Sequence, residues 1–433
     1  MKEIITKWNN GYFGGQLSQA VLKEFDQIDA DDRELLGFVD TWLYYFHMAG
    51  GNARNFSPLA ARFFAKVTRS YMPSLWAKIP PITRGGRLRV IDRLVQEILH
   101  LVPDRAIRFL DVGCGYPPLP TIETAESCPA WTCVGVDPNF PQWILHDNDG
   151  TGACFDQSGT LVYIQYLEGG LQPEPERVEK DRHSFTQHWA TLQNDSQLRA
   201  QLMRNEQLIV DPVNHYERHN LTFQAGTMTE LNGNQKYDLI RCMNVFMYFT
   251  GETILKNIRH AKLLLVDAGV FVCGSVPESG STAARYLVYQ KRDSALVPWL
   301  FGMDLGKFSQ RDGNGWWAFH RDQPDALFLA KVVRTLADDP ALSGRVHNLI
   351  DRVEHELGYS HRDRDGYLHQ TGFIYNTADN ERLNMAIASE FGDEITAFLT
   401  AVGICSRITP FGHLVIDLPR SSPEHYQRYF QVL

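Results

Sequence analysis

One segment, residues 107–118, limits most strongly what this chain can fold into. It reads Ile-Arg-Phe-Leu-Asp-Val-Gly-Cys-Gly-Tyr-Pro-Pro, a short apolar run that ends in Asp111 and continues into a turn containing Gly113 and Gly115. Glycine has no Cβ and tolerates positive φ, so a ligand can approach the backbone of such a turn. We expect a helix to start near Pro120. A strand, a glycine turn and a helix in this order predict an α/β sheet with a ligand at the carboxyl end of the strand.

Further short apolar runs support the same fold class. They are separated by turn or helix signals, as buried parallel strands are when helices alternate with them. These runs are residues 132–136, 221–224, 237–242, 269–273 and 286–290. The sequence therefore predicts a Rossmann-like α/β core.

The chain divides into three predicted regions of the 433 residues: 1–84, 85–300 and 301–433. In the first, apolar residues at helical spacing predict a helical cap; they are Leu35, Val39, Trp42 and Phe46. The second holds the core, and its residues 141–220 are too many for one compact connection, which predicts a long insertion after the second strand. The third is an α+β extension. It has predicted helices around 324–337, 341–357 and 380–402 and an apolar run at 413–418.

A second acidic residue follows the second predicted strand. Asp137 lies 22 residues after Gly115, and an acid at the end of this strand can accept both hydroxyls of a ribose. The dinucleotide fingerprint is broken, because Pro118 occupies its third glycine position. Asp111 would also repel a pyrophosphate, whereas S-adenosylmethionine carries an ammonium and a sulfonium and no phosphate. The charge argument therefore selects S-adenosylmethionine over NAD as cofactor.

Four blocks of the chain resemble the class I S-adenosylmethionine-dependent methyltransferases. They are Leu110–Gly115 with Asp137, Phe223–Met228, Tyr237–Phe249 and Leu263–Cys273. The resemblance implies a doubly wound, mostly parallel seven-stranded sheet with S-adenosylmethionine as cofactor. The third block is most similar to the CheR-like enzymes that methylate glutamates on chemotaxis receptors, but Met243 replaces an arginine of their motif. The subfamily is not identified.

The predicted site residues follow from these blocks. Those expected to bind the cofactor are Asp111, Gly113, Cys114, Gly115, Asp137, Pro138, Asn139, Thr227, Met228, Asn244 and Val245. Those expected to bind the substrate are Tyr116, Trp143 and Tyr248. The catalytic residue is unknown, with Tyr248 and Asn244 as candidates because they follow the fourth strand. Simpler interpretations remain: the glycines form only a tight turn, the two acids cap helices or turns, and Tyr248 packs in the core.

The predicted activity is transfer of a methyl group to an O, N or C acceptor of a small molecule or natural product. The sulfonium is already a good leaving group, so the reaction needs mainly proximity and alignment. No general base stands out, which favours a carboxylate or another acceptor that needs none. The alternatives are a CheR-like protein glutamate O-methyltransferase and a non-catalytic partner protein of the same fold. A homo-oligomer or a partner protein is compatible with either interpretation.

Composition argues against other classes of protein. The formal net charge of −9 disfavours nucleic acid and anionic membranes as partners. No apolar run reaches the roughly 18 residues of a spanning helix, and the first residues lack the apolar core of a signal peptide. Seven cysteines without framework spacing favour a reducing cytoplasm. No metal site is predicted, because His361–Gly366 begins like a calcium loop but position 372 is glycine rather than glutamate.

Overall fold

The computed structural model of this chain describes most of its length, and the description below concerns those residues. They are 2–11, 15–26, 28, 31, 33–53, 56, 58, 61, 62, 65, 83, 85–98, 106–166, 175–276, 284–293, 295–309, 321, 323–358 and 377–418. The predicted loop at His361–Gly366 lies outside them.

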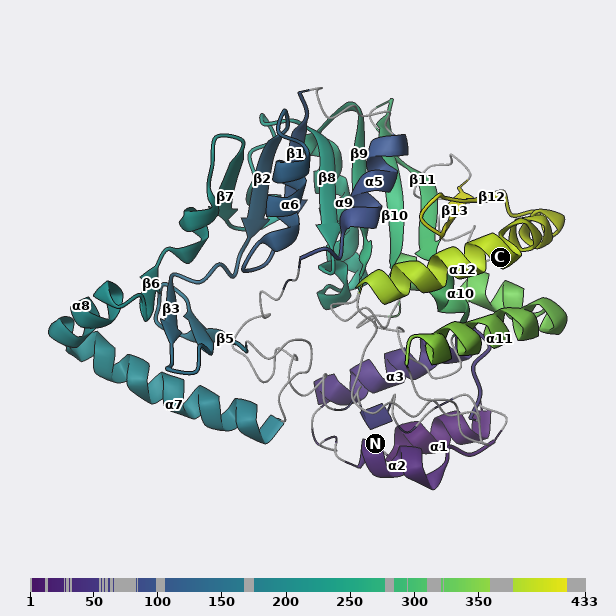
Figure 1. Cartoon of the computed structure of the whole chain (residues 1–433), viewed down its shortest axis with the longest axis horizontal. Helices are drawn as coiled ribbons and strands as arrows, with labels where there is room; N and C mark the ends of the chain where they lie inside the picture. Colours follow the sequence, from purple (N-terminus) through teal and green to yellow (C-terminus); the bar gives the residue numbers. More distant parts are fainter. Residues whose placement is uncertain are drawn as a thin grey trace.

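The core is one large sheet (Figure 1). Its strands, in spatial order, are β12 (Ser406–Ile408), β13 (His413–Asp417), β11 (Ala295–Asp304), β10 (Arg285–Arg292), β9 (Leu265–Ser275), β8 (Tyr237–Met243), β1 (Arg108–Val112), β2 (Thr132–Asp137) and β7 (Leu221–Ala225). The five strands from β7 to β9 are parallel to one another. From β1 the chain adds β2 and β7 on one side, and it then adds β8 and β9 on the other side of β1. The carboxyl ends of β1 and β8 therefore flank a switch point in the strand order, where such sheets bind ligands.

The prediction of seven mostly parallel strands is wrong in number and proportion, because the sheet has nine strands and its other four pairings are antiparallel. Two strands were missed, the three-residue β12 and β11, which crosses residue 300. The sequence of β11 contains Pro298, which cannot donate to a ladder and argues against a central strand. In the structure Pro298 lies opposite Tyr289, where the register shifts, so the irregularity accommodates it.

Helices cover both faces of this sheet, as expected of a doubly wound fold. On one face, α5 and α6 pack against Phe109 of β1; on the other, α9 and α10 pack with Leu110. The helices are α1 (Lys2–Gly11), α2 (Gln19–Phe25), α3 (Arg33–Met48), α5 (Arg89–Ile98), α6 (Leu119–Ser127), α7 (Pro175–Asn194), α8 (Ser196–Arg204), α9 (Gly251–Leu264), α10 (Pro324–Ala337), α11 (Pro340–Glu356) and α12 (Thr377–Ala401). Four short 3₁₀ helices are η1 (Pro212–Tyr216), η2 (Met228–Glu230), η3 (Phe246–Tyr248) and η4 (Leu305–Ser309).

The segment between β2 and β7 forms a second sheet with its own core. Its antiparallel strands lie in the order β5 (Leu161–Gln165), β4 (Gly152–Phe155), β3 (Trp143–His146) and β6 (Leu208–Val210). The aromatic ring of Trp189 from α7 stacks on Phe155, with centroids 4.4 Å apart. Figure 1 shows this unit beside the lower ends of β2 and β7, with α7 and α8 on its outer side. The sequence predicted an insertion here but not these short strands.

The terminal regions pack onto the same core. Val39, Trp42 and Phe46 of the predicted stripe are buried on α3, while the side chain of Leu35 lies outside the description. The three predicted C-terminal helices are α10, α11 and α12, and the last apolar run joins the main sheet as β13.

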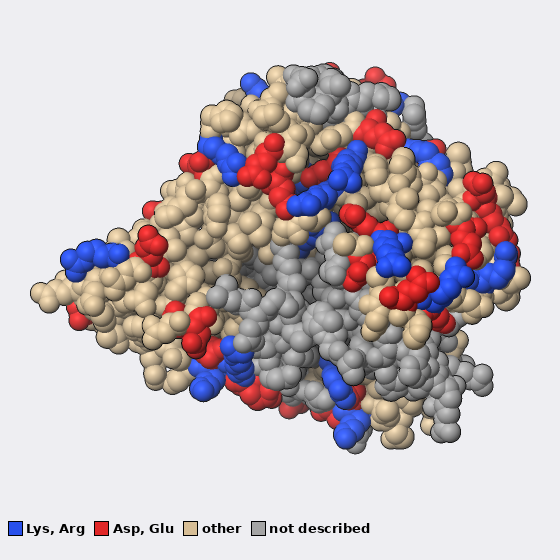
Figure 2. Space-filling view, in the orientation of Figure 1, with Lys and Arg blue, Asp and Glu red and all other residues tan. Residues whose placement is uncertain are grey.

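None of the described helices is long and apolar enough to cross a membrane. Figure 2 shows acidic and basic side chains side by side on one face of the molecule. Three exposed ion pairs join α11 to α12, through Arg345–Glu394, Arg352–Glu390 and Arg382–Glu356.

Candidate functional site

The glycine turn lies at the carboxyl end of β1, as its sequence predicts. Gly113 and Gly115 have φ values of +68° and +70°, a region that favours glycine. A Cβ on Gly113 would lie 2.2 Å from Cγ2 of Val245, so the turn and the segment after β8 approach each other closely here. The amide of Gly113 donates to the carbonyl of Val136 at 2.7 Å, which fixes the turn against β2. These contacts bring together residues from two of the predicted blocks and the end of β2.

Asp137 lies at the end of β2, next to this turn. Its Oδ2 accepts a 3.1 Å hydrogen bond from the amide of Gly115, and its Oδ1 accepts a 2.8 Å bond from the amide of Asn139. The side chain is 6% exposed, and no described residue forms an ion pair with it. Burial raises the pKa of Asp137 to about 6, although both backbone hydrogen bonds lower it. Asp137 is therefore a buried carboxylate without a described cation, able to accept further hydroxyl donors.

Asp111 does not offer a free carboxylate to the turn. Its two oxygens accept hydrogen bonds from the guanidinium of Arg241 on β8, at 3.0 and 2.6 Å, and Oδ2 also accepts a 2.6 Å bond from Thr121 of α6. This corrects the charge argument made from the sequence, because Arg241 offsets the charge of Asp111 that was expected to repel a phosphate. The side chains of Asp111 and Arg241 face the α5–α6 side of the sheet.

A second carboxylate also holds Arg241. Asp92 of α5 accepts from Nη1 of Arg241 at 2.6 and 2.7 Å, and Oγ1 of Thr124 accepts from the same atom at 3.0 Å. The guanidinium carbon lies 4.9 Å from the ring centroid of Phe109. The attraction of both acids raises the pKa of Arg241, against the effect of burial. We call Asp92, Asp111 and Arg241 the buried triad.

Asp92 and Arg241 were not predicted as parts of this edge. A signal was present, because Arg241 stands inside the apolar run of β8, and a charged residue in a buried strand requires a partner. The acids that provide it come from α5 and β1, which are 149 and 130 residues away in sequence. Sequence spacing alone could not select them.

Other predicted cofactor residues surround the turn but have structural contacts of their own. Cys114 is buried, and burial, followed by Asp137 and Asp111, raises the pKa of its thiol well above its usual value. Thr227 caps η2 in a reciprocal arrangement with Glu230. The side chain of Met228 is buried in the core, and Pro138 is exposed in the turn after β2.

The two candidate catalytic residues lie in the segment after β8. Asn244 has a φ of +62°, and its side chain exchanges two hydrogen bonds with the backbone of Val276, at 2.5 and 2.6 Å. It thereby ties the end of β8 to the end of β9. Tyr248 is half-buried in η3, and its amide donates to the carbonyl of Val245. Neither of these sets of hydrogen bonds places a general base beside the glycine turn.

Two predicted substrate residues belong to the second sheet or face it. Trp143 is on β3, where its ring centroid lies 5.7 Å from that of Trp189. Tyr116 is buried against Ile144, Cys154 and Val213, and its carbonyl accepts a 2.8 Å hydrogen bond from Nε2 of Gln165. The second sheet therefore contacts the end of the glycine turn, while Trp143 stays within its own core.

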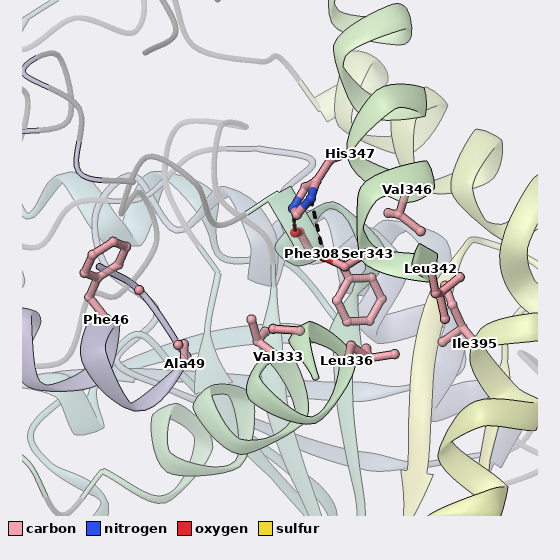
Figure 3. A pocket seen from close by; sticks show the side chains of 13 residues that line it. Phe46, Ala49, Phe308, Val333, Leu336, Leu342, Ser343, Val346, His347 and Ile395 are labelled. Atoms are coloured by element: carbon pink, nitrogen blue, oxygen red, sulfur yellow. Dashed lines mark hydrogen bonds between the residues drawn. The ribbon is translucent and has the colours of Figure 1, made fainter. Parts of the chain in front are cut away.

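A separate cavity of about 80 Å³ lies among α3, α10, α11 and α12 (Figure 3). Its wall is mostly apolar, from side chains such as Phe46, Val333 and Leu336. His347 is its main polar group. One ring nitrogen lies 2.7 Å from the carbonyl of Phe308 and the other 3.4 Å from Oγ of Ser343, so the protein itself engages both. The cavity contains no strand end and none of the predicted site residues.

Comparisons with known proteins concern the fold. No protein-family model and no curated protein matches the chain. Among solved structures, PKMT2 from Rickettsia typhi in complex with AdoHcy is similar at 15% identity and a TM-score of 0.24, over 46% of this chain and 26% of that one. Magnesium protoporphyrin IX methyltransferase from Synechocystis PCC 6803 with bound SAM is similar at 16% identity and a TM-score of 0.23, over 45% of this chain and 60% of that one.

The aligned parts thus span less than two thirds of both chains. A second structure of the Synechocystis enzyme, with bound SAH, is similar at 12% identity and a TM-score of 0.23 over 78% of this chain and 84% of that one. The two Synechocystis structures are of a methyltransferase, and a likeness this distant does not establish the family or the activity of this chain.

Proposed function

We propose that this protein is an S-adenosylmethionine-dependent methyltransferase with a small-molecule acceptor. One observation carries the proposal: the turn with Gly113 and Gly115 and the buried carboxylate of Asp137 lie side by side at the carboxyl ends of two parallel strands. A nucleoside fits this arrangement, because a ribose can donate both hydroxyls to one carboxylate while the glycines admit it close to the backbone.

The residues of the turn fit a nucleoside without phosphates better than a dinucleotide. Pro118 is the N-cap residue of α6, at the position where the third glycine of a dinucleotide fingerprint would allow close packing of the helix on the strand. Asp137 is buried without a described cation, so a phosphate beside it would meet an uncompensated negative charge. The charge of Asp111 no longer counts against a phosphate, because Arg241 pairs with it.

The chain's own part in the reaction would be to bind and align. S-adenosylmethionine supplies the activated methyl group when bound. Asp137 would hold the ribose, and the backbone around Gly113 and Val245 would limit where the rest of the cofactor lies. Effective molarity from alignment is a large source of rate in such displacements. Asn244 would act by holding the loop after β8, because its side chain is bonded to Val276.

Two alternatives differ in what the site does. A CheR-like protein glutamate methyltransferase would transfer label to a partner protein, and mild alkali would release it. A non-catalytic partner would bind the cofactor or nothing, and it is favoured by the contacts that already engage Asn244 and close Val245 onto Gly113. We rank both below the small-molecule enzyme.

Titration of the purified full chain with S-adenosylmethionine and S-adenosylhomocysteine tests the proposal. We expect micromolar binding of both ligands in the wild type and at least a tenfold weaker affinity in Asp137→Asn. The matched control is Asp238→Asn, which removes a carboxylate at the opposite edge of the sheet, where Asp238 accepts from the amide of Arg108. Absence of binding in the wild type, or equal losses in both variants, would refute the proposed cofactor site. Labelled methyl transfer to small molecules or to protein then separates the acceptor classes.

A further inference from the structure

The buried triad carries an excess of negative charge. Arg241 is 1% exposed and contributes one positive charge, whereas Asp92 and Asp111 contribute two carboxylates. Asp111 alone would be neutralised by the fork of hydrogen bonds from Nε and Nη2 of Arg241. The extra negative charge therefore comes from Asp92, on a helix that contributes none of the predicted cofactor residues; burial raises the pKa of this carboxyl, and the Arg241 guanidinium opposes that effect.

The position of the triad lets this charge act at the glycine turn. Asp111 is two residues before Gly113, and Thr121, which donates to Asp111, also interacts with the thiol of Cys114 inside the turn. Asp111 raises the pKa of Cys114 and of Asp137, and Arg241 lowers that of Cys114, so these two members of the triad interact with the charges of the turn. Burial strengthens such interactions, because few water molecules screen them.

We propose that Asp92 is a specificity-determining residue: its charge keeps the triad net negative and so favours a cationic ligand at the glycine turn over a neutral one. The inference rests on the proposed function and deepens it. S-adenosylmethionine carries an ammonium, a sulfonium and a carboxylate, for a net charge of +1. The product, S-adenosylhomocysteine, lacks the sulfonium charge and is neutral overall. Asp92 therefore favours exchange of product for substrate.

The expected size of this effect is modest. For a ligand charge about 10 Å or more from Asp92, at an effective dielectric constant of about 20 or above, the interaction changes affinity about three- to tenfold. The affinity of the neutral product changes little, since it has no net charge to interact. The ratio of the two dissociation constants is thus the sensitive quantity, because a general loss of structure would weaken both ligands together.

The test is calorimetric titration of the full chain with three ligands: S-adenosylmethionine, S-adenosylhomocysteine and sinefungin, an analogue with an amine in place of the sulfonium. In Asp92→Asn we expect affinity for both cationic ligands to fall about three- to tenfold and that for S-adenosylhomocysteine to stay within twofold. Asp92→Glu keeps the charge and should keep the wild-type ratio. If Asp92→Asn does not fold, Asp92→Ser removes the same charge with a shorter side chain.

Two controls separate charge from structure. Asp238→Asn removes a charge at the far edge of β8 and should leave the ratio unchanged. Thr124→Val removes a hydroxyl that lies 2.9 Å from Asp92, with no change of charge, and should also leave it unchanged. A parallel loss for all three ligands in Asp92→Asn would assign Asp92 a purely structural role and overturn the inference. If the wild type binds none of them, the proposed function itself fails.

Discussion

Arg241 and Arg285 are both buried in strands of the same sheet, yet their surroundings differ. Arg241 on β8 pairs with two acids, Asp92 and Asp111. Arg285 on β10 forms its ion pair with Asp325 of α10, at 2.9 Å, with Ser275 3.4 Å away. The second pair joins the sheet to a covering helix, with one acid for the arginine among the described ion pairs. The first leaves a net negative charge next to the glycine turn. A buried arginine in a strand therefore indicates that acidic residues lie nearby, but it does not indicate their number.

The largest expected effect is that of Arg241→Met. This change leaves the buried carboxylate of Asp111 and the partly buried carboxylate of Asp92 without their cation. We expect it to lower the free energy of unfolding by about 5 kcal/mol, the upper end for breaking a buried pair. The loss should be smaller at pH 5 than at pH 8. Without the cation the folded state binds protons more tightly than the unfolded state, so lowering the pH favours folding. Urea unfolding at both pH values measures this, and an equal loss at both would contradict it.

Arg285→Met should cost less, about 3 kcal/mol, because it leaves only the carboxylate of Asp325 without its described partner. The double variant Arg285→Met/Asp325→Leu replaces the whole pair by apolar groups and should recover at least half of that loss. The corresponding double variant Arg241→Met/Asp111→Leu should recover less, since Asp92 stays charged. Similar recovery in the two double variants would remove the distinction between the arginines.

Much of the main sheet was predictable, because its strands are continuous apolar runs. The five parallel strands and β10 coincide with predicted runs to within four residues at their ends. The second sheet was missed for the opposite reason: its strands have only three to five residues and pair locally, so no single run stands out. Pro298 similarly concealed β11.

The site was predictable in its turns but not in its buried charges. Gly113, Gly115 and Asp137 lie together because parallel strands end at one edge, which sequence order alone implies. The partner of Asp111 comes from a strand 130 residues later, and only packing selects it. Trp143 was predicted to bind the substrate, but it packs on Trp189 in a sheet that the sequence did not reveal.

Hydroxyl groups beside the two arginines offer a finer comparison. Thr121 donates to the charged Asp111 at 2.6 Å, whereas Ser275 lies 3.3 to 3.4 Å from Arg285, Gln323 and Asp325. We expect Thr121→Val to cost about 2 kcal/mol, as for a hydrogen bond to a charged group, and Ser275→Ala about 0.5 kcal/mol. Thermal and urea unfolding of the two variants side by side measures the difference. A larger loss for Ser275→Ala would reverse the expected order.

Asp137 extends the comparison to a buried acid without a described arginine. Its pKa is raised to about 6 by burial, above the usual value of 3.8. Its contribution to stability is therefore present at low pH and is lost as the pH rises through about 6.

Ligand binding should show the opposite trend, because the ionised form accepts ribose hydroxyls best. We expect affinity for S-adenosylmethionine to fall about tenfold from pH 8 to pH 5, as the ionised fraction falls to about a tenth. Asp137→Asn should bind more weakly at pH 8 and show a flatter profile between pH 5 and pH 8. A wild-type profile that is itself flat over this interval would show that the ionisation of Asp137 does not control binding.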